Sequence, residues 1–298
     1  MKKLFFITLL AFTAMTMNAG EHEKKLESIG DKSSTASEYG WKLIWSDEFD
    51  GNGAVDESKW NFERGFVRNE EYQWYQPQNA YKLDGILMLE GRLDSIPNPR
   101  YEEGSRDWKR NRPYARYSSA SINTRGKFDF QYGRLEVRAR IPAVRGSWPA
   151  IWTLGTTMGW PNNGECDVME YYEVNGQPTI LANAAWGGER RYQAVWNTKR
   201  IPYTHFLEKS PFWGEEFHIW RMDWDEDFIR LYLDDELLNE VDLSKTINGS
   251  IGEHRNPFHQ PHYILLNLAL GGQNGGEPIA DAFPMRYEID WVRVYKNN

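Results

Sequence analysis

The chain has 298 residues, of which 40% are hydrophobic, enough for one large domain or two modest ones. Its net charge of −8 argues against nucleic acids and anionic membranes as partners, because both carry negative charge. The 14 Trp, 16 Tyr and 14 Phe favour β-structure. The single cysteine, Cys166, excludes an intramolecular disulfide and a cysteine-based zinc site.

The first 19 residues have the pattern of a secretory signal peptide. Lys2 and Lys3 precede a short apolar stretch, Leu4 to Ala14, which is too short to span a bilayer, and Ala19 ends a cleavage site. The alternative is a buried N-terminal helix, although charged and serine-rich sequence follows. We therefore expect export to the periplasm or the medium, a flexible leader over residues 20–38, and a single domain over residues 39–298.

Strand patterns follow from residue 41 onward. YGRLEVRARIP (132–142) alternates apolar and polar side chains, and the runs 217–225 and 228–243 predict three consecutive strands with a hairpin turn at Asp234-Asp235. HYILLNLALGG (262–272) is typical of a strand buried on both faces, and YEIDWVRVYK (287–296) alternates again. Residues 100–119 are the least strand-like part and predict a basic, mobile loop. Short strands between turns indicate an all-β sandwich or barrel.

Three acids lie close together in GECDVMEYY (164–172). On a regular strand, Glu165 and Asp167 share one face while Glu170 points to the other. A β-bulge near Val168 and Met169 would turn Glu170 onto their face. Three carboxylates in one cleft should raise at least one pKa and would suit acid–base work on a glycosidic bond. The alternatives are acids that protect an exposed strand edge and a calcium site built from clustered oxygens.

Two tryptophans, Trp148 and Trp152, lie just upstream in GSWPAIW (146–152). Beside an acid cluster they suit stacking against the apolar faces of sugar rings; the alternative is packing in the β core.

The order of several blocks resembles glycoside hydrolase family 16, in its laminarinase-type branch with a bulge in the catalytic strand. The similar blocks are WSDEFDG (45–51), NEEYQWY (69–75), the run 117–142, SWPAIWTLG (147–155), the E-x-D-x-x-E pattern of 165–170, and YEIDWVRVYK. The resemblance implies a jelly-roll, concanavalin A-like β-sandwich with an open cleft across its concave sheet. It implies that Glu165 is the nucleophile of a retaining hydrolase, Asp167 the assisting acid and Glu170 the general acid/base.

The resemblance also implies contacts beyond the acids. Trp148 and Trp152 would line the subsites beside the scissile bond. Asn69, Glu71 and His218 are further candidate substrate contacts, although His218 is equally a satisfied histidine on a strand. Arg112 and Arg116 either contact substrate or belong to a solvated loop.

A structural calcium is a further implication, since many family members bind one on the convex face. Glu48 and Asp290 are the matching side chains, and each is otherwise an ordinary surface acid. Catalysis would need no cofactor.

Some segments depart from the family pattern. Cys166 replaces the usual Ile or Val between the first two acids. Asn183 and Trp186 occupy the region where the family carries a histidine, and both are further candidate substrate contacts. Residues 171–206, which should shape the acceptor subsites, and LGGQNGG (270–276) also differ from laminarinases.

The implied function is an exported, endo-acting retaining hydrolase of β-glucans with β-1,3 or mixed β-1,3/1,4 linkages. The alternative substrate is a galactose-containing glycan, either an agar-type galactan or a poly-N-acetyllactosamine or mucin O-glycan. A non-catalytic sugar-binding module and a transglycosylase are further alternatives. The expected partner is a polysaccharide or oligosaccharide, and we expect a monomer without membrane insertion.

Overall fold

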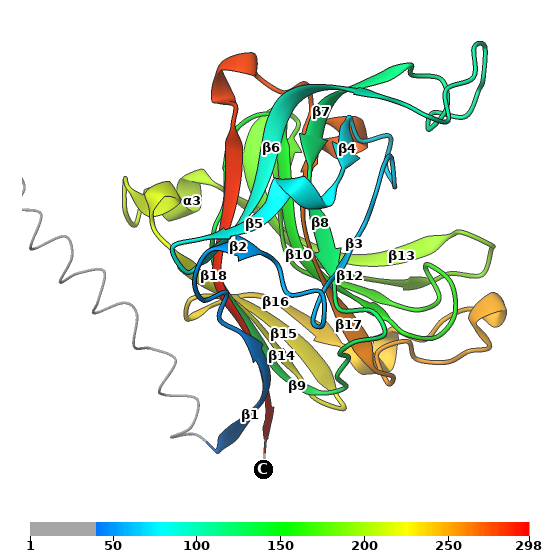
Figure 1. Ribbon diagram of the computed structural model, residues 1–298. Helices are drawn as coiled ribbons and strands as arrows, with labels where there is room; N and C mark the ends of the chain where they lie inside the picture. The colour runs from blue at the N-terminus through cyan, green and yellow to red at the C-terminus, as the bar shows by residue number, and fades with distance from the viewer. Residues whose placement is uncertain (1–39, 298) are drawn as a thin grey trace, which may run out of the picture. The chain divides into compact units, whose positions relative to one another are not determined.

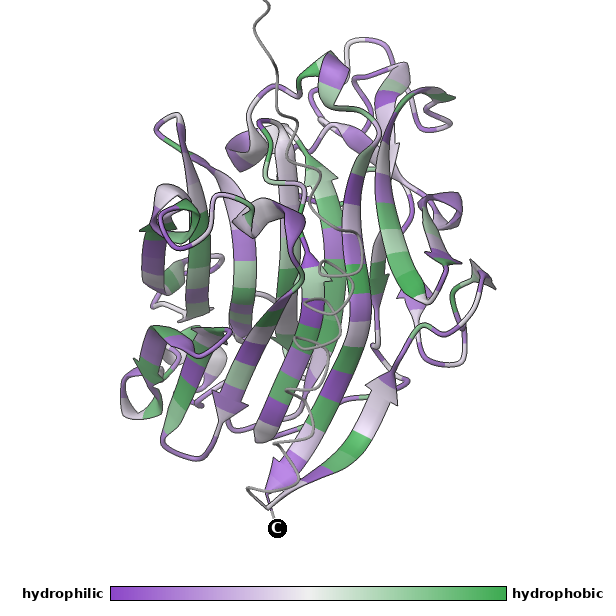
Figure 2. Cartoon of the chain, turned by 90° about the vertical axis from the view of Figure 1, so that its left-hand side faces the viewer, coloured by the Kyte–Doolittle hydropathy of each residue, from purple (hydrophilic) through white to green (hydrophobic). Residues whose placement is uncertain are grey.

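Alternation of apolar and polar residues determines how the strands pack. The run over 132–142 forms β9 (Gly133–Arg140), in which Leu135, Val137 and Ala139 are fully buried. The arginines of this strand are half-buried, and Glu136 is buried. Figure 2 shows the same alternation of hydrophobic and hydrophilic residues along the long strands. Side chains on successive strand residues point to opposite faces, so each strand presents one apolar face to a core.

The predicted strands 217–243 are confirmed as β14 (His218–Trp224), β15 (Phe228–Leu233) and β16 (Glu236–Asp242). Leu233 pairs with Glu236 across the turn at Asp234-Asp235, as expected. The apolar run 262–272 forms β17 (His262–Leu270), in which every residue is buried, and the last run belongs to β18 (Met285–Asn297).

The strands form two large sheets (Figure 1). The first has the order β16-β15-β14-β9-β18-β6-β5-β2, with β1 on β18, β7 on β6 and β4 parallel to β7. Its remaining members are β1 (Trp41–Asp47), β2 (Gly53–Ala54), β4 (Gln73–Tyr75), β5 (Ala80–Leu83), β6 (Ile86–Pro97) and β7 (Tyr114–Ser119).

The second sheet has the order β13-β12-β11-β10-β17-β8-β3 and is antiparallel throughout. Its members besides β17 are β3 (Asn61–Phe62), β8 (Ser121–Asn123), β10 (Ser147–Gly155), β11 (Glu165–Val174), β12 (Gln177–Gly187) and β13 (Ala194–Pro202). The short helices are α3 (Thr204–Leu207), α4 (Gly272–Gly275), η2 (Pro77–Asn79), η3 (Trp213–Glu215), η4 (Leu243–Lys245), η5 (Ser250–Gly252) and η6 (Ala280–Ala282).

One apolar core joins the two sheets. Leu135 and Val137 of β9 and Trp220 of β14 share it with Ile151 of β10 and Leu266 of β17, all fully buried. Burial of such side chains contributes about 1.5–3 kcal/mol each, which is why the sheets stack as a sandwich. The fold is the all-β, jelly-roll sandwich that the sequence implied.

This computed structural model describes residues 40–297, and Leu43–Lys296 form one compact unit. The expected signal peptide and leader, residues 1–38, lie outside the described residues. Between residues 40 and 297, no helix has the length and apolarity that crossing a membrane requires.

The prediction for residues 100–119 was wrong in part. Tyr114–Ser119 form β7, which pairs with β6, and the loop between the two strands extends away from the sheets in Figure 1. Arg112 is not a solvated side chain: it is half-buried, and its guanidinium lies 4.2 Å from the Phe66 ring and 5.4 Å from the Trp108 ring. Pairing with β6, a long-range contact, overrides the polar local sequence.

Candidate active site

A bulge in β11 brings the three acids to one face. The register of β11 against β12 shifts between Asp167 and Glu170, and Val168 and Met169 are both fully buried. Two consecutive residues thus point into the core, which turns the following Glu170 back to the side of Glu165 and Asp167. The predicted bulge near Val168-Met169 is confirmed.

The acids line a cleft of about 760 Å³ on the second sheet. Cross-strand register aligns the cleft side chains in rows over β17, β10, β11, β12 and β13. The three rows are Tyr263–Leu154–Glu165–Ala185–Trp196, Leu265–Trp152–Asp167–Asn183–Thr198 and Asn267–Ala150–Glu170–Leu181–Arg200. A long chain molecule lying across the strands would therefore pass over the acids in the middle of the sheet.

The apolar floor of the cleft lies on one side of the acids. Ala150, Trp152, Tyr263 and Leu265 form a buried cluster of their own, separate from the main core. Such a floor, with polar side chains around it, matches the flat apolar faces and polar edges of a sugar chain.

Each acid is oriented by neutral donors. The indole N–H of Trp160 donates to Glu165 Oε2 at 2.8 Å, and that of Trp148 donates to Glu170 Oε1 at 2.8 Å. The Asn183 amide donates to Asp167 Oδ2 at 3.2 Å and to Glu170 Oε2 at 3.0 Å. These bonds fix the carboxylates without neutralising them with a cation.

Burial raises the pKa of all three carboxyl groups. The pKa of Glu165 rises from 4.5 to about 7, first through burial and then through the charge of Glu170, against the stabilising bond from Trp160. Asp167, buried between the two glutamates, has a pKa well above its usual range for the same reasons. Burial also raises the pKa of Glu170, opposed by the hydrogen bonds from Trp148 and Asn183. The cluster therefore retains protons at pH values at which isolated carboxyl groups are ionised.

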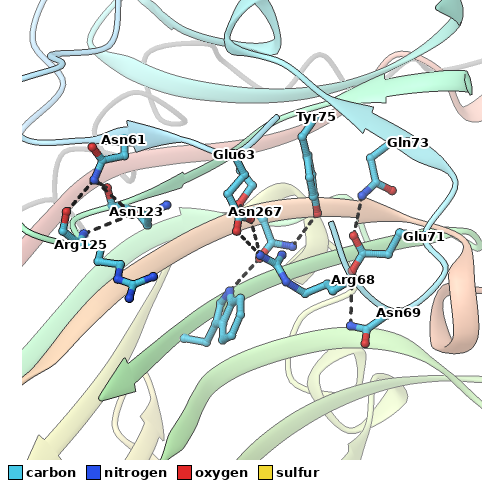
Figure 3. Close-up of polar contacts among 12 residues, drawn as sticks. Asn61, Glu63, Arg68, Asn69, Glu71, Gln73, Tyr75, Asn123, Arg125 and Asn267 are labelled. Carbon is cyan, nitrogen blue, oxygen red and sulfur yellow. Dashed lines mark hydrogen bonds and ion pairs between the residues drawn. The ribbon is translucent and has the colours of Figure 1, made fainter. Parts of the chain in front are cut away.

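The loop over residues 66–72 and the strand β4 that follows it form the wall beside β17 (Figure 3). Glu71 is buried and accepts a 2.7 Å hydrogen bond from Gln73 Nε2 and a weaker one from Asn69 at 3.4 Å. Burial raises the pKa of Glu71, against the charge of Arg68. Arg68 pairs with Glu63, so the wall carries a balanced ion pair beside a carboxyl group aimed at the cleft.

The floor and this wall are also connected by hydrogen bonds. Trp152 Nε1 donates to Asn267 Oδ1 at 2.7 Å, and Asn267 Nδ2 donates to the Tyr75 hydroxyl at 3.3 Å. The Arg68 guanidinium lies 5.1 Å from the centroid of the Trp152 ring. The contacts with Asn267 and Arg68 thereby fix the orientation of the Trp152 ring.

Two glycines permit the wall to approach β17. Gly271 and Gly272 have φ values of +65° and +72°, which side chains rarely adopt. A Cβ at Gly271 would lie 2.3 Å from the Tyr72 ring, and one at Gly272 would lie 2.7 Å from the Asn69 carbonyl oxygen. The departure LGGQNGG thus has a structural role, and the α4 residues Gln273 and Asn274 also line the cleft.

Five of the seven expected substrate contacts line this cleft: Trp148, Trp152, Asn69, Glu71 and Asn183. The other two lie elsewhere. Trp186 faces the main core, three residues after Asn183 and therefore on the other face of β12. His218 lies in the first sheet, stacks on Trp213 at 4.0 Å, and bonds to the Trp213 carbonyl and Asp234. It is a satisfied histidine on a strand.

The two expected calcium ligands are both in ion pairs. Glu48 accepts two hydrogen bonds from Arg293, at 3.0 and 2.7 Å, and Asp290 pairs with Arg138. Each carboxylate thus pairs with a guanidinium, whose positive charge disfavours a divalent cation beside it. Within residues 40–297, no group of three or more His, Cys, Asp and Glu side chains gathers as metal ligands do.

The sequence reasoning missed some of the cleft residues. Trp160, in GWPNNGE directly before the acids, could have been inferred from its nearness in sequence. Arg68, Asn267, Trp196 and Arg200 carry no local signal, because only sheet pairing and the wall loop bring them to the acids.

A cleft that combines a flat apolar floor, aromatic side chains and a set of protonatable carboxylates is suited to one type of ligand and reaction. The ligand is a glycan, and the reaction is acid-assisted cleavage between its units. The fold and the site together define a glycan-cleaving enzyme.

Comparison with known proteins also points to a glycan-cleaving enzyme. Residues 71–293 match the family described as "Glycosyl hydrolases family 16". The chain is 34% identical over 268 residues to a "Beta-glucanase" of Rhodothermus marinus, covering 86% of this chain and 85% of that protein. It is 32% identical over 270 residues to a "Keratan-sulfate endo-1,4-beta-galactosidase" of Sphingobacterium multivorum, covering 86% of this chain but only 55% of that protein.

Solved structures show the same relationship. The laminarinase from Rhodothermus marinus superposes with a TM-score of 0.69 at 32% identity, covering 86% of this chain and 97% of that one. A structure from work described as "Prominent members of the human gut microbiota express endo-acting O-glycanases to initiate mucin breakdown" gives 0.76 at 34% identity, covering 87% and 92%. The chain belongs to glycoside hydrolase family 16, and it is an endo-acting hydrolase of O-glycosyl bonds of the retaining type.

Proposed function

We propose that the chain cleaves internal bonds of β-glucans with β-1,3 or mixed β-1,3/1,4 linkages, as an exported monomer. The observation that carries the proposal is the bulge in β11, which brings Glu165, Asp167 and Glu170 to one face of the strand and into one cleft. The relatives named as β-glucanases and laminarinases support the substrate class.

The proposed mechanism is a double displacement. Glu165 attacks the anomeric carbon while Glu170, whose pKa is raised by burial, donates its proton to the leaving oxygen. The glycosyl-enzyme is then hydrolysed by water that Glu170 deprotonates. The proton transfers and covalent bonds of this mechanism involve only the substrate, Glu165, Glu170 and water.

Asp167 is the proposed assisting acid. It is 2% exposed and lies between the two glutamates, and its strongly raised pKa keeps it protonated. A protonated Asp167 hydrogen-bonds to Glu165, which stabilises the ionised form that the nucleophile needs.

A galactose-containing glycan is the second candidate substrate. Two observations favour it: the similarity to the keratan-sulfate endo-1,4-beta-galactosidase, and the TM-score of 0.76 with the structure from the O-glycanase work. Cleavage of a galactose-containing glycan would use the same chemistry of Glu165 and Glu170. Only the sugars that the subsites accept would differ.

The test is product analysis by size on a panel of polymers. The panel holds laminarin, mixed-linkage barley glucan, agarose, porphyran and a keratan-type lactosamine polymer. Short oligomers from laminarin or barley glucan support the β-glucanase proposal, whereas oligomers from the galactose-containing chains alone refute it in favour of the second candidate. Products longer than the starting oligosaccharide would reveal transfer to sugar in place of water. The Glu165→Gln variant serves as the inactive control.

A further inference from the structure

The strand β13 forms the edge of the second sheet and has two different faces. Trp196, Thr198 and Arg200 line the cleft, while Asn197 accepts a hydrogen bond from Asn239 on the opposite face. Lys199 lies between two cleft residues and therefore points away from the cleft.

The position of β13 places these side chains on the side of the acids away from the wall at β17, in the segment 171–206 that the family resemblance assigns to the acceptor subsites. Trp196 lies in the row of Glu165 and Arg200 in the row of Glu170, each two strands away. Neighbouring strands are about 4.8 Å apart, so the two side chains lie roughly 10 Å from the acids. The wall loop with Asn69 and Glu71 lies at β17, on the other side of the acids.

Arg200 differs from the other charged groups of the cleft. Glu63 and Arg68 pair with each other, and Glu71 and the three acids accept hydrogen bonds. Among residues 40–297, no carboxylate lies within ion-pair distance of Arg200, and Arg200 is exposed. Its charge acts on the neighbouring Tyr172. The phenol pKa of Tyr172 is raised, chiefly by burial, and the positive charge of Arg200 opposes this rise.

Trp196 supplies a complementary surface. It is 46% exposed, which is unusual for a tryptophan that has the apolar Ala185 beside it on the next strand. An exposed indole that lines a cleft is a stacking surface for the apolar face of a sugar ring.

We propose that Trp196 and Arg200 form an acceptor-side subsite for a sugar that carries an anionic substituent, a sulfate ester or a carboxylate. The indole stacks on the ring, and the planar guanidinium fork binds two oxygens of the anion. This inference rests on the proposed function for the direction in which the glycan lies. It assigns a role to the segment 171–206 that departs from laminarinases.

The test compares charged and neutral forms of the same chain. The probes are laminarin oligosaccharides with and without oxidation of C6 to a carboxylate, and keratan sulfate oligosaccharides with and without chemical desulfation. We expect Arg200→Gln to lower kcat/KM on a charged form about tenfold while kcat/KM on its neutral form changes little, because the lost interaction is charge-assisted. The pair that responds shows whether the anion is a sulfate or a carboxylate.

Two further variants make the result specific. Lys199→Gln removes the same charge one residue away and should leave the ratio of charged to neutral kcat/KM unchanged. Trp196→Ala should lower kcat/KM on both forms alike. The inference is overturned if Arg200→Gln affects both forms equally or if Lys199→Gln has the same effect.

Failure of the proposed function gives a different result. If the wild-type protein cleaves none of these chains, the substrate assignment is wrong, and the subsite is tested by calorimetric titration with the same four oligosaccharides. Weaker binding of a charged form to Arg200→Gln, with binding to Lys199→Gln unchanged, supports the subsite. Equal binding to all three proteins refutes it.

Discussion

Replacement of Glu165 by Gln should change how stability depends on pH as well as abolish activity. Activity is lost because no nucleophile remains. The stability effect follows from the buried position of Glu165, where burial and the charge of Glu170 disfavour the ionised carboxylate.

The magnitude follows from the raised pKa. A carboxyl group whose pKa rises from 4.5 to about 7 on folding stabilises the folded state below pH 4.5, and this contribution is lost as the pH rises through about 7. One pKa unit corresponds to about 1.4 kcal/mol, so the rise from 4.5 to about 7 gives a loss of up to about 3.5 kcal/mol. Gln carries no charge and avoids the loss. We therefore expect Glu165→Gln to be more stable than the wild type at pH 8, by a melting temperature difference of up to about 10 °C, and similar to it at pH 5.

The assay is thermal unfolding followed by circular dichroism at pH 5 and pH 8. Glu103→Gln is the matched control, because Glu103 is an exposed carboxylate in the loop between β6 and β7. It removes the same charge without relieving burial and should keep the wild-type pH dependence. Equal pH dependence for Glu165→Gln and the wild type would refute the reasoning.

Three further predictions follow from the site. Glu170→Gln should cleave natural glycans slowly but retain activity on substrates with activated aryl leaving groups, measured as kcat on both, because only the former need a proton; equal losses would contradict the acid role. Trp160→Phe removes the indole donor to Glu165 and should raise the pKa of Glu165 further, which moves the acid limb of the plot of kcat/KM against pH upward from about pH 7. An acid limb at the wild-type pH would show that this hydrogen bond does not control the ionisation of Glu165. Chelation by EDTA should leave the melting temperature unchanged, because arginines hold Glu48 and Asp290; a fall of several degrees would show a bound structural cation.

Much of the fold was predictable because strand alternation is a local property. Leu135, Val137 and Ala139 are buried as their period of two indicates. The bulge was predictable for a related reason: Glu170 falls on the wrong face unless Val168 and Met169 both turn inward.

Trp186 and His218, the two expected contacts that do not line the cleft, could not be placed by strand alternation alone. Trp186 is near Asn183 in sequence, but an odd separation of three residues on β12 sends it to the core. His218 lies on β14, a strand of the other sheet. A local sequence pattern does not predict which of the two sheets a strand joins.

The sequence by itself determined the strands, the acids and the need for a bulge, because side-chain facing depends on neighbours along the chain. Only the tertiary structure decided which residues meet those acids. Trp160, Arg68 and Asn267 come from separate segments, and Arg200 reaches its row through two strand registers. Register depends on pairing between distant segments, whose free energy is set by packing of the whole sandwich and not by any local stretch.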